Sequence, residues 1–186
     1  MPPHGAIGKA APGVDARVID TNGQVLGVRQ TGELVVRAPG TFTRYAHAPE
    51  LTDRALSPYG FRTGDLCHYD EQGYFYLTGR IKDIIIRGGA NIAPAEVENV
   101  LTSHPSVQLA AVVGAPDPTF GERVVGFAVL RADARATSQE LVEFCAARLA
   151  EFKVPHDIRI IERMPLGPTA KIDKNALKKA AAESSE

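Results

Sequence analysis

The feature that most constrains the fold of this chain is a change of hydrophobic pattern near residue 83. The first 80 residues are β-rich in pattern, with short apolar or alternating segments separated by turn residues such as Asn22-Gly23. We expect strands at residues 14–20, 33–38 and 74–77, and turns at residues 21–23 and 70–73. One short helix is expected at residues 49–56, because proline suits the first turn of a helix and an acid favours its positive end.

After residue 83, strand patterns alternate with helix patterns. Strands are expected at residues 84–86, 107–113, 124–130 and 158–161, and helices at residues 94–101, from Thr137 onward, and at residues 175–183. The middle helix carries a capping box, with Thr137 at its start and Glu140 three residues later, and its apolar spacing continues to Leu149. This alternation predicts a small α+β domain.

We therefore predict an α+β fold in two parts, a β-rich part at residues 1–82 and a small α+β domain at residues 83–186. The 186 residues are 44% hydrophobic and 23% charged, which is ordinary for a folded chain and allows two small domains. With 21 basic and 22 acidic side chains, the net charge is only -1. A net charge this small produces only a weak electrostatic field, which argues against nucleic acid or an anionic membrane as the main partner.

The two cysteines, Cys67 and Cys145, have no Cys or His at metal-ligand spacing. We therefore predict no metal site and two buried or half-buried thiols in a reducing compartment. The N-terminus lacks a charged segment followed by an apolar one, and no apolar run approaches the roughly 20 residues of a membrane span. These observations predict a cytoplasmic protein without a membrane span.

Two polar clusters lie at the end of the β-rich part. Residues 62–65, Arg-Thr-Gly-Asp, precede an expected strand-turn-strand unit, where the Asp65 carboxylate can accept hydrogen bonds from the vicinal hydroxyls of a ribose. Taken alone, Asp65 is better explained as a turn residue. Residues 79–83 carry three charges, among them Arg80 and Lys82, at the boundary between the two parts, and a solvated linker would also explain them.

Two further clusters lie in the second part. Residues 87–91 contain Gly88-Gly89, and paired glycines permit a positive φ and a close approach of the backbone to a ligand. A tight turn alone would explain these glycines nearly as well. Residues 165–171 form a loop rich in proline and glycine that ends at Lys171, and a loop lysine is suited to a phosphate or a developing negative charge.

Together, and in this order, the clusters resemble the C-terminal part of the adenylate-forming (AMP-binding) enzymes, a family of acyl- and aryl-CoA synthetases, nonribosomal adenylation domains and firefly luciferase. The resemblance extends from about residue 32 to residue 177. The matching segments are residues 32–34, 62–65, 70–73 with Tyr76, 79–83, 87–92, 94–98, Asp117 with residues 121–122, 152–155 and 165–174.

The resemblance implies a reaction in two steps. A carboxylate attacks the α-phosphate of ATP to give an acyl-adenylate and pyrophosphate, and a thiol, usually that of coenzyme A, then displaces AMP. It implies that Asp65 binds the ribose hydroxyls, that Arg80 lies near ribose and phosphate, and that Lys171 bridges phosphate and carboxylate oxygens during adenylation.

The resemblance also implies that the C-terminal domain rotates between the two steps. Lys82 would lie at the hinge, and Gly88 and Gly89 would line the tunnel for the pantetheine arm of coenzyme A. Residues 1–82 would be the β-rich end of a large N-terminal domain, and residues 83–186 the mobile C-terminal domain.

The implied substrates are a carboxylic acid, ATP and coenzyme A. The family's Ser/Thr/Gly-rich phosphate loop and its acyl pocket have no match here. We therefore expect ATP and its Mg²⁺ to be held mainly by a missing N-terminal domain, which would also be a partner, and the chain to be inactive alone.

The predicted function is that of a C-terminal fragment of an ATP-dependent acyl-CoA ligase, with fatty acid metabolism as its setting. Coenzyme A is preferred to a carrier-protein thiol because no carrier-protein domain follows. Two alternatives stay open: a non-catalytic module that binds a nucleotide or docks on a separate N-terminal domain, and part of an aryl- or amino-acid-adenylating enzyme.

One residue departs from the family pattern. The family usually has glycine directly before the catalytic lysine, whereas this chain has Ala170. If the backbone there requires a positive φ, alanine adopts it at a cost and the loop is altered.

Overall fold

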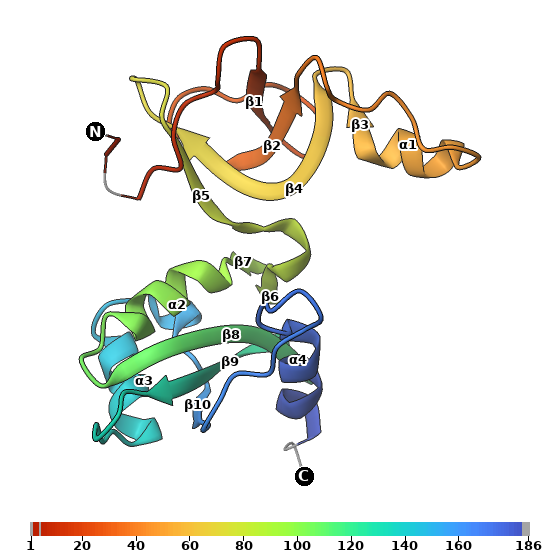
Figure 1. Ribbon diagram of the computed structural model, residues 1–186. Helices are drawn as coiled ribbons and strands as arrows, with labels where there is room; N and C mark the ends of the chain where they lie inside the picture. The colour runs from red at the N-terminus through yellow and green to blue at the C-terminus, as the bar shows by residue number, and fades with distance from the viewer. Residues whose placement is uncertain (1, 4, 184–186) are drawn as a thin grey trace. The chain divides into compact units, whose positions relative to one another are not determined.

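The computed structural model describes residues 2–3 and 5–183 and is shown in Figure 1. The chain divides into two compact units, Met1–Lys82 and Asp83–Glu186. Each unit contains one five-stranded sheet, and the α+β class predicted from the pattern is confirmed. No helix in the described part of the chain is long and apolar enough to cross a membrane.

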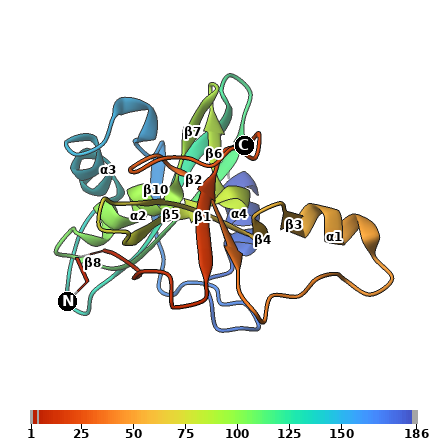
Figure 2. The same cartoon turned by 90° about the horizontal axis from the view of Figure 1, so that it is seen from above.

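The first unit is an antiparallel sheet in the order β1-β2-β4-β3, with β5 paired to β4. Its strands are β1 (Asp15–Ile19), β2 (Gly32–Arg37), β3 (Leu56–Ser57), β4 (Gly60–Tyr69) and β5 (Phe75–Arg80). The predicted short helix is α1 (Pro49–Ala55), which precedes β3 and lies at the outer end of this unit in Figure 1 and Figure 2. Val18, Cys67 and Phe75 form the buried centre of the unit.

The sequence places residues 62–65 before a strand, and this expectation is wrong. They lie inside β4, which continues through them as a ten-residue strand. The pairing with β2 is interrupted there, because Glu33 pairs with Leu66 while Val35 pairs with Arg62. Gly64 has a φ of 71°, which only glycine adopts readily, so the turn signal is accommodated as a β-bulge.

The second unit is a sheet in the order β10-β9-β6-β7, with β8 also paired to β9. β10 is parallel to β9, and the other pairs are antiparallel. The strands are β6 (Ile85–Arg87), β7 (Ala90–Ile92), β8 (Val107–Asp117), β9 (Gly121–Leu130) and β10 (Asp157–Ile160). The helices are α2 (Pro94–Thr102), α3 (Ser138–Ala146) and α4 (Lys174–Glu183), and the 3₁₀ turns of the chain are η1 (Ile81–Asp83) and η2 (Glu151–Lys153).

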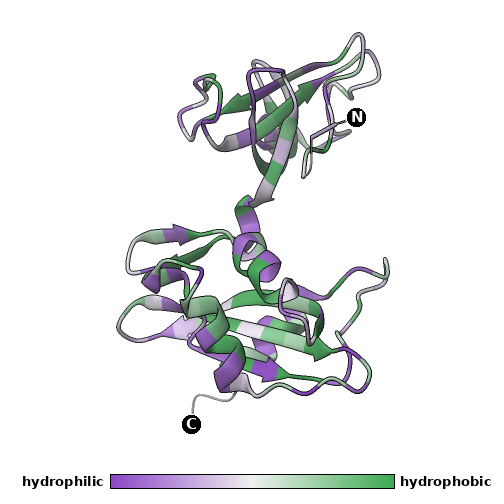
Figure 3. Ribbon diagram, turned by 90° about the vertical axis from the view of Figure 1, so that its left-hand side faces the viewer, coloured by the Kyte–Doolittle hydropathy of each residue, from purple (hydrophilic) through white to green (hydrophobic). Residues whose placement is uncertain are grey.

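Side chains on β8 and β9 alternate between two cores, because successive residues of a strand point to opposite faces. Val112 and Val124 belong to a core with α2 and α3, whereas Val113 and Val125 belong to a core with Leu177 of α4. Figure 3 shows these central strands as largely apolar. The helices therefore cover both faces of the second sheet.

Two details differ from the sequence expectation. The predicted capping box between Thr137 and Glu140 is present, but α3 ends at Ala146 instead of continuing to Leu149. The chain turns there, with Leu149 N donating to Cys145 O. The sequence also does not predict the short strands β3, which pairs with β4, and β7, which pairs with β6.

Candidate functional site

Asp65 and Arg80 lie opposite each other on β4 and β5. Arg80 Nε donates a hydrogen bond to Asp65 Oδ1 over 2.6 Å, and the Asp65 side chain is only 25% exposed. Bonds between ionised groups are shorter and stronger than neutral ones. The sheet register thus brings together the two residues that sequence analysis assigns to nucleotide binding.

Arg80 of this pair lines an open pocket of about 510 Å³, and Asp65 follows the lining residue Gly64 directly in the sequence. The pocket is lined by Glu33, Arg54, Arg62, Thr63, Gly64, Arg80, Ile81 and Lys82. Four of these side chains are basic and one is acidic, a balance that favours a polyanion such as the phosphates of a nucleotide. A second pocket of about 510 Å³, lined by residues 44–49 with Thr52 and Asp53, contains none of the predicted site residues.

Cys67 lies two residues after Asp65 and is fully buried. Burial, with a smaller contribution from the negative charge of Asp65, raises the pKa of the Cys67 thiol to about 11. This thiol is therefore protonated at neutral pH and serves as packing, in agreement with the buried thiol that the sequence predicts. Cys145 is also fully buried, and burial raises its pKa to about 11 as well.

Lys82 lies in η1 and is exposed. It is the last residue of the first unit, since the second begins at Asp83. Its side chain also lines the pocket that contains Arg80 and Arg62. Lys82 therefore adds a positive charge to the candidate nucleotide site.

Gly88 and Gly89 form the two-residue turn between β6 and β7. Their φ values are 56° and 83°, and a positive φ at both central positions is typical of a type I′ hairpin turn. Gly88 N donates to Phe120 O over 2.8 Å, which ties the turn to the start of β9. Both glycines are exposed, and a Cβ at Gly89 would meet no atom within 4 Å. The hairpin accounts for the glycines and leaves their backbone accessible.

Lys171 lies on a tight hairpin-like loop whose two sides meet at Leu166 and Ile172. Gly167 N donates to Lys171 O over 2.8 Å, and Ala170 N donates to Gly167 O over 3.0 Å. Ala170 has a φ of 57°. Sequence analysis predicts a cost at Ala170 if the backbone before the lysine has a positive φ. The backbone does have a positive φ there, and an alanine adopts it. The Lys171 side chain itself is exposed.

The structure adds two carboxylates that sequence reasoning does not single out. Glu33 is buried beside Arg62, and Glu98 bridges α2, β8 and α4. Glu33 occurs in the Gly-Glu-Leu segment of the family pattern, and a charged residue inside an otherwise apolar strand was the available signal. Arg62 is far from Glu33 in the sequence, and Lys174 is far from Glu98, so these contacts could not be inferred from a short segment.

Residues 96–171 match the family model described as the AMP-binding enzyme C-terminal domain. The chain belongs to the AMP-binding, adenylate-forming enzymes and corresponds to the C-terminal part of such proteins. Sulfoacetate–CoA ligase of Cupriavidus necator is 40% identical over 171 residues, which are 91% of this chain and 33% of that protein. Medium-chain fatty-acid–CoA ligase of Escherichia coli is 43% identical over 175 residues, which are 92% of this chain and 31% of that protein.

The fold agrees with these relatives. The crystal structure of ATP-bound MatB from Rhodopseudomonas palustris superposes with a TM-score of 0.89 at 35% identity, covering 95% of this chain and 35% of that one. The chain thus spans about a third of the length of the curated relatives it matches.

Proposed function

We propose that the chain is the C-terminal part of an ATP-dependent acyl-CoA ligase. The observation that carries this proposal is the bond between Asp65 and Arg80 at a pocket with four basic side chains. A carboxylate that can accept hydrogen bonds from hydroxyl groups, beside a pocket with basic side chains, fits a nucleotide. The ribose hydroxyls would bind to Asp65, and the phosphates would bind to the basic side chains. The names of both curated relatives described above end in CoA ligase, which supports coenzyme A as the second substrate.

In the first step, a carboxylate oxygen of the acid attacks the α-phosphorus of ATP, and the bond to pyrophosphate breaks. Negative charge grows on the phosphoryl oxygens, and the ammonium of Lys171 is proposed to stabilise it. In the second step, the sulfur of coenzyme A, whose proton is lost to solvent, attacks the acyl carbon, and the bond from that carbon to the phosphate oxygen breaks as AMP leaves. That step makes no use of Lys171, whereas Gly88 and Gly89 offer the pantetheine arm a backbone without side chains.

Lys82 is proposed as the hinge between residues 1–82 and residues 83–186, which would be the end of the large domain and the mobile domain. Its exposure in a short 3₁₀ turn supports this role, since a hinge must change backbone angles without disturbing a core. Among the described residues, no group of three or more His, Cys, Asp or Glu side chains gathers as metal ligands would. We propose that the Mg²⁺ that accompanies ATP is held mainly by the missing N-terminal domain.

The acid is not specified by these residues. The names of the relatives include sulfoacetate, a small anion, and medium-chain fatty acids, whose hydrocarbon chains are apolar. We infer that the pocket for the acid lies in the two thirds of the relatives that this chain does not match. By the same reasoning, the chain alone is expected to be inactive.

The proposal can be tested with a joined protein, in which this chain replaces the matching C-terminal segment of the Escherichia coli relative and follows the N-terminal part of that enzyme. ATP–pyrophosphate exchange is then measured with fatty acids for the joined protein and for the chain alone. Asp65→Ala in the joined protein should weaken ATP binding roughly ten- to hundredfold, the value of a hydrogen bond to a charged group.

The matched control is Asp53→Ala, which removes an exposed carboxylate of α1 outside the basic pocket and should leave exchange unchanged. If Asp65→Ala leaves the affinity for ATP unchanged, Asp65 does not bind the ribose and has only a structural role in the β-bulge. A joined protein without exchange activity, beside an active unaltered relative, would favour the non-catalytic binding module.

A further inference from the structure

Glu33 is the one charged residue that is buried in the described part of the chain, with 7% of its surface exposed. It lies on β2, at the position where the pairing with β4 breaks. Burying a carboxylate costs free energy unless hydrogen bonds and an opposite charge compensate for the lost water. A chain that keeps such a group at this position requires a reason beyond packing.

The break in the ladder lies at the Arg-Thr-Gly-Asp segment. Between the pairs Glu33–Leu66 and Val35–Arg62, a single residue of β2 faces three residues of β4, the last of which is Asp65. Such a bulge removes ladder hydrogen bonds from the backbone groups that it displaces. Those groups need other partners.

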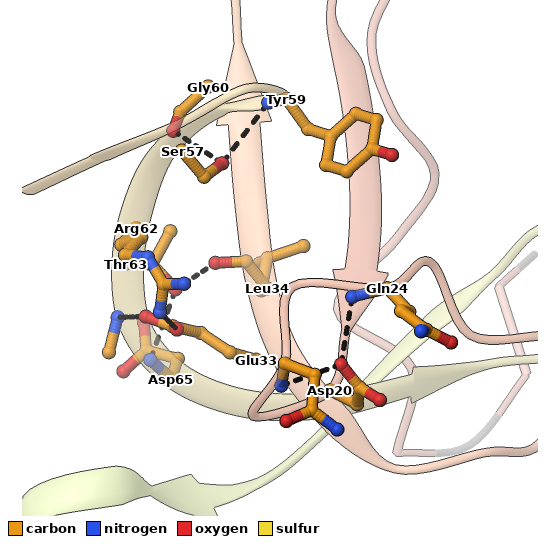
Figure 4. Close-up of polar contacts among 12 residues, drawn as sticks. Asp20, Gln24, Glu33, Leu34, Ser57, Tyr59, Gly60, Arg62, Thr63 and Asp65 are labelled. Atoms are coloured by element: carbon orange, nitrogen blue, oxygen red, sulfur yellow. Dashed lines mark hydrogen bonds and ion pairs between the residues drawn. The ribbon is translucent and has the colours of Figure 1, made fainter.

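Side chains supply these partners, as Figure 4 shows. Arg62 Nη1 donates to Glu33 Oε2 over 2.7 Å, and the amide of Gly64 donates to Glu33 Oε1 over 3.2 Å. Thr63 Oγ1 donates to the carbonyl of Leu34 over 2.8 Å and accepts from the amide of Asp65 over 3.0 Å. Glu33 and Thr63 thus hold the backbone of the bulge on the side of β2.

On the other side, the bulge leads directly into the candidate site. Asp65 is the first residue of β4 that pairs with β5, and its partner is Arg80. The direction of the Asp65 carboxylate is therefore set by a backbone that Thr63 and Glu33 hold and by the bond from Arg80 Nε. A shift of this backbone would move the carboxylate relative to the pocket.

We propose that Glu33 is a positioning residue that holds the bulge in the shape that presents Asp65 to the ribose of a nucleotide. The inference rests on the proposed function for the identity of the ligand. In physical terms, the buried carboxylate of Glu33 holds the Gly64 amide and Arg62, and through them it fixes the position of Asp65, the acid that contacts the ligand.

The first test needs no ligand. In the ¹⁵N-labelled chain, the Nε–H signal of Arg80 reports its bond to Asp65, and the Nε–H signal of Arg17, which donates to Asp15 in the same unit, is the internal reference. Glu33→Gln keeps the shape of the side chain and removes its charge. It should shift the Arg80 signal and speed its exchange with water, while the Arg17 signal stays in place.

Two further variants make the result specific. Thr63→Val keeps the shape of the residue, removes the hydroxyl that accepts from the Asp65 amide, and should reproduce the shift of the Arg80 signal even if Glu33→Gln folds poorly. Glu71→Gln removes an exposed carboxylate that pairs with Arg29, and should leave the Arg80 signal unchanged. An unchanged Arg80 signal in both Glu33→Gln and Thr63→Val would overturn the proposal.

The second test uses AMP and 2′,3′-dideoxy-AMP as probes in NMR titrations of the chain. The unaltered chain should prefer AMP by at least about tenfold, the value of a hydrogen bond to a charged group. Glu33→Gln should reduce this preference towards one while leaving the affinity for the dideoxy nucleotide unchanged. A merely structural role would weaken the binding of both nucleotides equally and would overturn the positioning role.

The two proposals can fail separately. If the unaltered chain does not distinguish AMP from its dideoxy analogue, the ribose assignment of Asp65 fails and this inference fails with it. If Asp65→Ala abolishes the preference but Glu33→Gln retains it in full, the nucleotide site stands and the positioning role of Glu33 is wrong.

Discussion

Lys174 Nζ lies 2.8 Å from Glu98 Oε1, and the same carboxylate oxygen accepts a hydrogen bond from the amide of Val112 over 2.9 Å. This contact joins the first turn of α4 to α2 and to β8. The two side chains are only 25% and 22% exposed, so water screens the pair less than it screens a surface ion pair. Because Lys174 follows Lys171 by three residues, the pair anchors the end of the loop that presents the candidate catalytic lysine.

Glu98→Gln is expected to loosen this anchor. The amide can still accept from Val112 N, but Lys174 loses its counter-ion in a partly buried position. We expect the free energy of unfolding to fall by about 1–2 kcal/mol, and amide hydrogen exchange at residues 165–173 to become faster.

The control is Glu96→Gln on the same helix. Glu96 pairs with Lys153 at 2.7 Å but is 46% exposed, so its loss should cost less than about 1 kcal/mol. It should leave hydrogen exchange at residues 165–173 unchanged. Equal effects of the two substitutions on this loop would contradict an anchoring role for Glu98.

Ala170→Gly is expected to stabilise the protein. A non-glycine residue in the left-handed region costs about 1–2 kcal/mol, and the added freedom of glycine in the unfolded chain offsets about 0.4–1 kcal/mol of the relief. We therefore expect a gain of about 0.5–1 kcal/mol in urea unfolding. Ala176→Gly, in the exposed first turn of α4, should instead destabilise by up to about 1 kcal/mol. Destabilisation by both substitutions would show that Ala170 is not strained.

Lys171→Ala should separate the two half-reactions in the joined protein. The loss of one preorganised charge should slow pyrophosphate exchange by about 10²–10³-fold. Thioester formation from a supplied acyl-adenylate should change little, because the proposed rotation of the second domain carries Lys171 away from the reacting groups before that step. Lys179→Ala, an exposed lysine of α4, is the control and should leave both rates unchanged. Equal slowing of both steps by Lys171→Ala would refute its assignment to adenylation.

Gly89→Leu should have the opposite effect, because its isobutyl group would project into space that is open in this unit and obstruct the thiol. Adenylation should survive. The φ of 83° strains any residue with a side chain, so Gly89→Ala is the control: alanine shares this strain but adds only a methyl group, and it should form thioester faster than Gly89→Leu. A variant Gly89→Leu that forms thioester at the original rate would exclude the glycine turn from the thiol path.

The two buried thiols predict a dependence of stability on high pH. Burial raises the pKa of Cys67 and of Cys145 from 9.0 to about 11 in the folded chain. Their contribution is therefore fully present below pH 9 and is lost as the pH rises towards 11, because the unfolded chain releases the protons first. The midpoint of thermal unfolding should fall over this range, and less so in a variant with Cys67→Val and Cys145→Val. Identical pH profiles for the two proteins would contradict the shifted pKa values.

Local signals were sufficient for most elements. Proline and an acid at the start of α1, the capping box of Thr137 and Glu140, and the apolar spacing of α2 and α4 act within one or two helical turns. The alternation of side chains on β8 and β9 depends only on neighbouring residues. These signals predict the α+β class and most of the strands and helices in their order, but not the short strands β3 and β7.

The order of polar clusters along the chain also identifies the family, because each cluster is a short segment whose residue types can be read directly. The positive φ of Ala170 belongs with these local features. The sequence shows alanine where the family has glycine, and the structure shows that the loop from Gly167 to Lys171 does require a positive φ at this residue.

Only the tertiary structure decided how the site is assembled. Asp65 meets Arg80 because β4 and β5 pair in one register, Glu33 meets Arg62 across a bulge, and Glu98 meets Lys174 from 76 residues away. The same segment that contains Asp65 reads locally as a turn, yet it lies within a strand because β2 pairs with β4 on both sides of the bulge and β5 pairs with β4 from Asp65 onward. Register and long-range ion pairs depend on the summed free energy of many distant contacts, which no short segment of sequence contains.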